Sequence, residues 1–140
     1  MPVTVKSVTI WRKEVENQPG VLAAALEPLA QAGANLKVLM GYRLPGEEGR
    51  AAIEFFPIAG AKAAKAAAAI GLTKSSIPAL HVEGDDKAGL MHSIARALAG
   101  AGINVSFVVA QAVGRKYAAI WGFESAEAAR KAASLIRKTR

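Results

Sequence analysis

Apolar and polar residues in the first half of the chain recur with the two periods that distinguish strands from helices. Residues 7–15 are rich in Val, Ile, Thr and Trp, which is typical of a β-strand. From Val21 to Ala32 the apolar residues recur at helical spacing, and Gly33 is a suitable end for that helix. The pattern then predicts a strand at 36–44, a turn at 45–49, a strand at 50–57 and an alanine-rich helix at 61–70.

The second half of the chain predicts the same order of elements. They are a strand at 77–83, a helix at 88–101, a strand at 103–112, a strand at 116–123 and a helix at 125–138. The two halves also share residues at a constant offset, 89 − 20 = 69 positions. Such pairs are Gly20 and Gly89, Leu29 and Leu98, Gly33 and Gly102, and Asn35 and Asn104. Ala51-Ala52-Ile53 returns as Ala118-Ala119-Ile120, which is two residues closer because the second hairpin is shorter.

The repeat predicts an α+β protein made of two similar units. Each unit reads strand, helix, strand, strand, helix, and an alternating antiparallel sheet needs its helices packed on one face. A fourth strand at 72–76 completes the first unit, whereas no strand follows the last helix. Residues 2–6 align with 71–75 at the same offset, so we expect the N-terminal strand to complete the second unit, within the chain or in a partner chain. The predicted units are 1–70 and 71–140, with strand 2–6 assigned to the second and strand 72–76 to the first.

The bulk composition limits the classes of function that remain. The chain of 140 residues is 52% hydrophobic with 6% aromatic residues, which predicts an ordered protein with an aliphatic core. It contains no cysteine, which excludes disulfides, thiolate metal sites and a cysteine nucleophile. No signal peptide or membrane span is predicted, and we expect a cytoplasmic protein without a membrane partner.

The net charge is +7, and the excess is concentrated near the C-terminus. Residues 115–140 contain seven Lys or Arg and two Glu, with few aromatic residues between them. A basic surface can attract an anionic partner, but this pattern is more typical of a solvated helix than of a nucleic-acid site. A nucleic-acid-binding sheet stays open as an alternative, and it would need exposed aromatic residues.

The segment before the first helix of each repeat combines residue types that suit a small ligand. Asn17 and Asp86 precede the helices, where a side-chain oxygen can cap free backbone N–H groups. Gly20 and Gly89 leave room for another group to approach closely. A helix N-terminus favours a carboxylate, and an oxygen of Asn17 or Asp86 can accept a hydrogen bond from an ammonium group. These features suit a free amino acid, and they equally suit a well-capped helix start that binds nothing.

Both loops resemble those of the ACT domain family. The resemblance rests on Asn17-x-Pro19-Gly20-x-Leu22 with Gly33-x-Asn35, and on Asp86-x-x-Gly89-Leu90 with Gly102-x-Asn104. It implies a ferredoxin-like βαββαβ fold for each unit and binding of amino acids or related ligands at interfaces between domains. The resemblance covers nearly the whole chain, once in each half. With two such units, the chain resembles stand-alone tandem ACT regulators of the glycine cleavage system repressor type.

The predicted ligand-binding residues lie in and just after the two loops. By the resemblance the loop positions are Asn17, Gln18, Gly20, Asp86, Lys87 and Gly89. Val21 and Leu90 follow the two glycines and are added to the site. His92 lies opposite the apolar side of its helix, and it is either a ligand contact or an exposed histidine.

No catalytic residue, metal site or cofactor is predicted, because no nucleophile motif or zinc-ligand spacing is present. We expect a non-catalytic regulatory or sensor protein. Half-exposed sheets predict a homodimer, and a metabolic enzyme or regulator is a candidate further partner. A ligand-free accessory subunit of an amino-acid metabolic enzyme is the other alternative.

Overall fold

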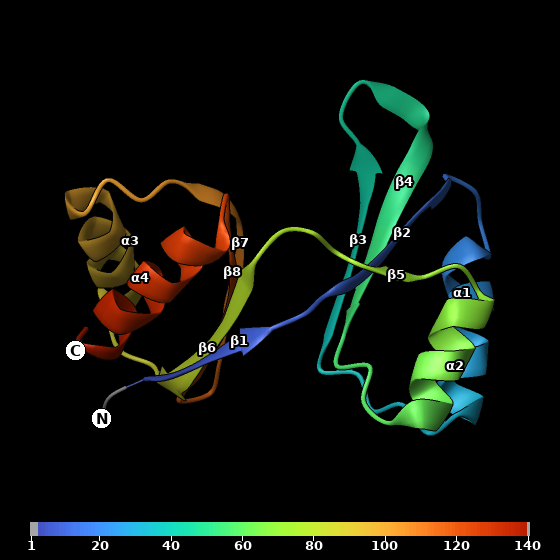
Figure 1. Ribbon diagram of the computed structural model, residues 1–140, viewed down its shortest axis with the longest axis horizontal. Helices are drawn as coiled ribbons and strands as arrows, with labels where there is room; N and C mark the ends of the chain where they lie inside the picture. The colour runs from blue at the N-terminus through green and yellow to red at the C-terminus, as the bar shows by residue number, and fades with distance from the viewer. Residues whose placement is uncertain (1–2, 140) are drawn as a thin grey trace. The chain divides into compact units, whose positions relative to one another are not determined.

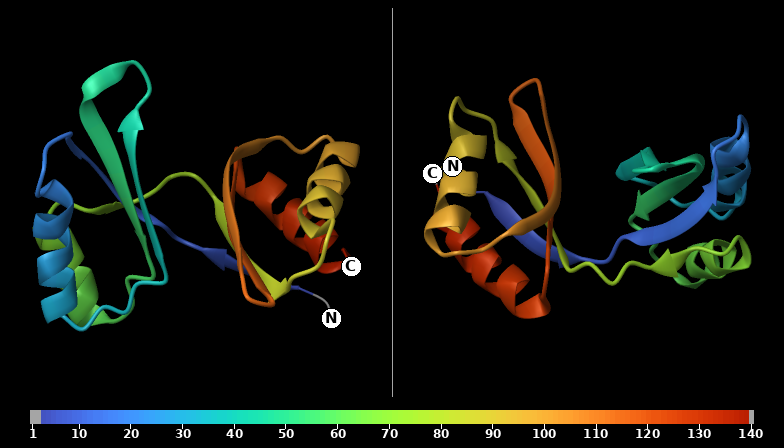
Figure 2. Two further views of the ribbon diagram at one scale, coloured as in Figure 1. Left: turned by 180° about the vertical axis from the view of Figure 1, so that it is seen from behind. Right: turned by 90° about the horizontal axis from the view of Figure 1, so that it is seen from above.

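A computed structural model describes residues 3–139, which divide into two units. The first unit is Thr9–Ser75, and the second combines the N-terminal stretch up to Val8 with the chain from Ser76 onward. Within each unit the helices lie on one face of an antiparallel sheet (Figures 1 and 2). No helix in the described range is long and apolar enough to cross a lipid bilayer.

The sheet of the first unit has the strand order β3-β4-β2-β5. The elements of this unit are β2 (Trp11–Glu16), α1 (Val21–Gln31), β3 (Val38–Leu44), β4 (Glu47–Phe56), α2 (Ala61–Ala69) and β5 (Thr73–Lys74). Ile53 and Phe55 of β4 form one core with Ala25 and Leu29 of α1 and Ala67 of α2. They do so because alternate residues of a strand point to the same face.

The sheet of the second unit has the strand order β1-β6-β8-β7. The elements of this unit are β1 (Thr4–Val8), β6 (Ala79–Asp85), α3 (Leu90–Gly100), β7 (Val105–Val113), β8 (Lys116–Phe123) and α4 (Ala126–Arg137). Ile94 and Leu98 of α3 pack with Ile136 of α4 and Trp121 of β8 in its core. Both units thus have the ferredoxin-like arrangement, and the predicted fold class is confirmed.

The N-terminal strand β1 completes the second sheet, as predicted, and it does so within the same chain. β1 pairs with β6 in antiparallel register along all five of its residues. Val5 is buried in the core, and its carbonyl accepts a hydrogen bond from Arg137 Nη2 at 3.1 Å. Residue 2 of the predicted 2–6 strand lies outside the described residues. The single strand predicted at 7–15 is wrong, because residues 9 and 10 separate β1 from β2.

The two hairpins correspond to each other differently from the prediction. Val15 pairs with Ala51 in the first sheet, and Gly84, which is 84 − 15 = 69 residues later, pairs with Tyr117 in the second. Ala51 therefore corresponds to Tyr117 and not to Ala118. The alanine-rich triplets match in composition, but a shift of one residue places a side chain on the opposite face of a sheet.

Candidate functional site

The Asn17 loop (residues 17–20) joins β2 to α1 and is hydrogen-bonded to the start of β4. The Asn17 backbone N–H donates to the carbonyl of Gly49, and Asn17 Nδ2 donates to the carbonyl of Glu48, both at 3.0 Å. The predicted capping role of Asn17 is wrong, because Gly20 is the N-cap of α1 and no described side chain bonds to that cap position. Since Glu48 engages only Nδ2, the Oδ1 atom of Asn17 can still accept a hydrogen bond.

Gly20 is the residue at which this loop turns into the helix. Its φ of 88° lies in the left-handed region, where any side chain is strained. A Cβ atom there would meet no other atom within 4 Å. The backbone conformation therefore requires glycine, and the space beside Gly20 is open.

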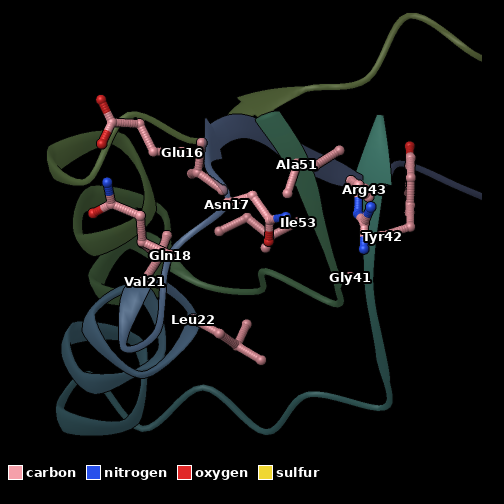
Figure 3. Close-up of a pocket in the computed structure, with 12 residues that line it drawn as sticks. Glu16, Asn17, Gln18, Val21, Leu22, Gly41, Tyr42, Arg43, Ala51 and Ile53 are labelled. Carbon is pink, nitrogen blue, oxygen red and sulfur yellow. The ribbon is translucent and has the colours of Figure 1, made fainter. Parts of the chain in front are cut away.

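A cavity of about 420 Å³ lies between the start of α1 and the strands β2, β3 and β4 (Figure 3). We call it the Asn17 cavity. Its lining includes Asn17, Val21, Leu22, Arg43, Ala51 and Ile53. The volume falls in the range of small-molecule sites. Leu22 projects from α1 toward β3 and β4 in Figure 3, so the cavity has an apolar wall on its helix side.

Arg43 of β3 supplies the positive charge of the Asn17 cavity. It pairs with Ala51, which pairs in turn with Val15, so all three side chains share the sheet face that carries the helices. No salt bridge joins Arg43 to an acidic group within residues 3–139. Its guanidinium group is therefore available to an anionic ligand, and guanidinium binds carboxylate in a bidentate geometry.

The structure brings some of the predicted loop residues to this cavity together with residues of the hairpin. Asn17, Gln18 and Val21 belong to its lining, and the side chains of Gln18 and Glu16 are directed away from the strands in Figure 3. Arg43 and Ile53 were missed because they come from the hairpin, and only the strand register brings them to the loop. The available signal was a single charged residue in the otherwise apolar segment 38–44.

The Asp86 loop (residues 86–89) occupies the equivalent position in the second unit. The Asp86 N–H donates to the carbonyl of Arg115 at 2.8 Å, and Gly89 is the N-cap of α3 with a φ of 87°. No side chain in the described range bonds to that cap position, so the predicted capping by Asp86 is also wrong. Asp86, Lys87 and His92 are exposed, whereas Leu90 is only 3% exposed and belongs to the core.

Each sheet carries an ion pair between its own charged side chains. Lys116 Nζ lies 2.7 Å from Asp85 Oδ1, and this hydrogen bond lowers the pKa of Asp85. In the first sheet the hydrogen bond from Arg12 lowers the pKa of Glu14, 2.9 Å away. The acidic and histidine side chains of residues 3–139 form no group that could hold a metal ion.

Tyr42 and Glu54 form a separate polar pair on the first sheet. The Tyr42 hydroxyl donates to Glu54 Oε2 at 2.6 Å, and Glu54 is buried. Burial raises the pKa of Tyr42, and the hydrogen bond to Glu54 raises it further. Because Tyr42 is adjacent to Arg43 in β3, its side chain lies on the other face of the sheet. Tyr42 still contributes to the lining of the Asn17 cavity, while its hydroxyl is bonded to Glu54.

The fold is similar to that of solved structures along nearly its whole length. Protein BT0572 from Bacteroides thetaiotaomicron matches with a TM-score of 0.77 and 14% identity, over 96% of this chain and 98% of that one. The regulatory subunit of aspartate kinase from Thermus thermophilus, in its ligand-free form, matches with a TM-score of 0.64 and 16% identity, over 99% and 97%. Aspartokinase alpha and beta subunits match with a TM-score of 0.66 and 16% identity, over 99% and 96%.

No protein-family model matches the chain, and no curated protein matches its sequence. At sequence identities of 14% to 16%, the similarity to these solved structures establishes the fold alone. It confirms the tandem arrangement of ferredoxin-like units that the ACT resemblance predicts.

Proposed function

We propose that this chain is a non-catalytic regulatory protein that senses a free amino acid, or a similar small carboxylate, in the Asn17 cavity. The observation that carries the proposal is a cavity of about 420 Å³ formed by the Asn17 loop, an apolar wall and Arg43, which has no salt bridge within residues 3–139. A neighbour of the same fold that is named as a regulatory subunit supports a regulatory role.

Each part of a free amino acid finds a complementary group in this cavity. Arg43 and the uncapped N-terminus of α1 attract the carboxylate, since both present N–H donors and positive charge. The Oδ1 atom of Asn17 accepts a hydrogen bond from the ammonium group. Val21, Leu22 and Ile53 offer an apolar surface to the ligand side chain.

A ligand held in this way bridges two parts of the first unit. The Asn17 loop already bonds to the start of β4 through Gly49 and Glu48, and Arg43 lies on β3 of the same hairpin. The ligand therefore stabilises the arrangement in which loop and hairpin are close. Regulation follows if that arrangement has a different affinity for a second copy of the chain or for a metabolic enzyme.

Replacing Arg43 with alanine tests the proposed carboxylate contact. We expect Arg43→Ala to weaken binding of the ligand by about ten- to hundredfold, because a charge-assisted hydrogen bond is lost. Isothermal titration calorimetry of the full chain with the free amino acids gives the affinity. Arg50→Ala is the matched control, since Arg50 lies in the same hairpin near Glu14 and outside the cavity lining. Equal affinities of wild type and Arg43→Ala would contradict the contact.

A further inference from the structure

The two units differ at one sheet position that lines the Asn17 cavity. In the first unit this position is Ala51, which pairs with Val15 and lines the cavity. In the second unit the corresponding residue is Tyr117, which pairs with Gly84. A methyl group in one unit is thus replaced by a phenol ring in the other, on the same side of the sheet.

The Tyr117 side chain is part of the packed core of the second unit. It is 1% exposed and belongs to the same cluster of buried side chains as Leu90 and Trp121. Its hydroxyl accepts a hydrogen bond from Trp121 Nε1 at 3.3 Å. The ring is therefore buried in the core, at the sheet position that corresponds to Ala51 of the Asn17 cavity.

Two further positions also differ between the units, and in the second unit both are less suited to a ligand. Arg43 pairs with Ala51, and Ala112 pairs with Tyr117, so the second unit has alanine where the first has its unpaired cation. Val21, which is partly exposed at the start of α1, corresponds to Leu90, which is buried at the start of α3. Among the described residues, the second unit therefore has a buried ring in place of Ala51 and no cation in place of Arg43, although the start of α3 beside Gly89 is as open as that of α1.

We propose that only the first unit keeps a ligand site, and that the chain binds one small carboxylate through Arg43 and the Asn17 loop. This inference rests on the proposed function. The Asp86 loop keeps the turn and the left-handed Gly89 because they build the unit, and it contributes no ligand contact. The specificity of the molecule is then set by residues of the first unit alone.

Backbone amide signals of the ¹⁵N-labelled full chain locate the bound ligand, whichever amino acid it is. We expect titration with each of the twenty free amino acids to shift the amides of Asn17 and Gly41 for at least one of them, and to saturate at one ligand per chain. The amide of Gly89 should stay in place. Shifts at Gly89 with or without shifts at Gly41 would overturn the single site while leaving the sensing function intact. No shift with any amino acid would remove the sensing function and the single site together.

Two substitutions install the residues of the second unit in the first. Ala51→Tyr should abolish the shifts at Gly41 by filling the cavity, and Arg43→Ala should weaken binding at least tenfold. Arg50→Ala should bind as the wild type does. Because Ala51→Tyr can also disturb folding, the dispersion of the amide spectrum is read first, and Arg43→Ala decides if that variant is unfolded. Full binding by folded Ala51→Tyr, or by Arg43→Ala, would overturn the inference.

Discussion

At the scale of single residues, the backbone around Gly20 explains more of the loop than its polar side chains do. The sequence indicated that Gly20 and Gly89 are special, and both have the left-handed conformation that favours glycine. The predicted caps were wrong because Asn17 bonds to the neighbouring hairpin, and that hairpin is more than 30 residues away in the sequence. Local patterns cannot reveal such a partner, whereas they do reveal a glycine that a turn requires.

Substituting Gly20 with alanine tests this conformational requirement. We expect Gly20→Ala to lower the free energy of unfolding by about 1–2 kcal/mol, because an L-residue is strained at this φ although no atom blocks its Cβ. Urea denaturation followed by circular dichroism measures the change. Gly49→Ala is the control, since Gly49 also has open space but no positive φ. An equal loss in both variants would argue against backbone strain as the cause.

The ionisation of Tyr117 gives a second test at this scale. Burial raises the pKa of the Tyr117 phenol, so the folded state favours its neutral form. The resulting stability is fully present below the ordinary tyrosine pKa of about 10 and is lost as the pH rises further, because the unfolded chain ionises first. Tyr117→Phe should be less stable than the wild type by about 1 kcal/mol at neutral pH, since Trp121 Nε1 loses its acceptor.

Denaturation midpoints of both proteins between about pH 8 and about pH 11 provide the measurement. The advantage of the wild type over Tyr117→Phe should shrink as the pH rises. A constant difference across this range would contradict a buried, neutral Tyr117.

At the scale of elements, the order of strands and helices was predicted and their exact partners were not. Alternation and helical spacing identify each element because they reflect which face is buried. The place of β1 could be predicted because the repeat leaves one strand missing from the second unit. The register of β8 could not, because Ala51-Ala52-Ile53 resembles the wrong triplet and only the pairing with β6 decides between two faces.

Val5 tests the contribution of β1 to the second unit. Val5→Ala should cost about 2 kcal/mol of unfolding free energy, because it removes buried methyl groups from the core that α4 and β6 share. Lys6→Ala, in the same strand but exposed, should change the stability by less than about 0.5 kcal/mol. Chemical denaturation monitored by the fluorescence of Trp121 reports on this unit, with Trp11→Phe as the background. Similar small effects of both substitutions would show that β1 adds little to the core.

At the scale of the whole molecule, the chain has two units of one fold with different interiors. The same turn geometry is kept at Gly20 and Gly89, while an open cavity lies beside one loop and a buried tyrosine lies in the unit of the other.

The exposed aromatic residues do not favour the nucleic-acid alternative, although the chain is basic. Tyr42 is the one aromatic side chain among the strongly exposed large hydrophobic residues of the described chain, and its hydroxyl is bonded to Glu54. A stacking surface for bases needs several exposed aromatic rings.

The central claim is that the Asn17 cavity binds a free amino acid, and isothermal titration calorimetry of the full chain tests it most directly. Titration with each of the twenty amino acids should give saturable heat for at least one of them, with one ligand bound per chain. The affinity for that amino acid should fall when its α-carboxylate is amidated, because Arg43 then loses its charged partner. Absence of saturable heat across all twenty, with the protein shown to be folded by circular dichroism, would contradict the claim.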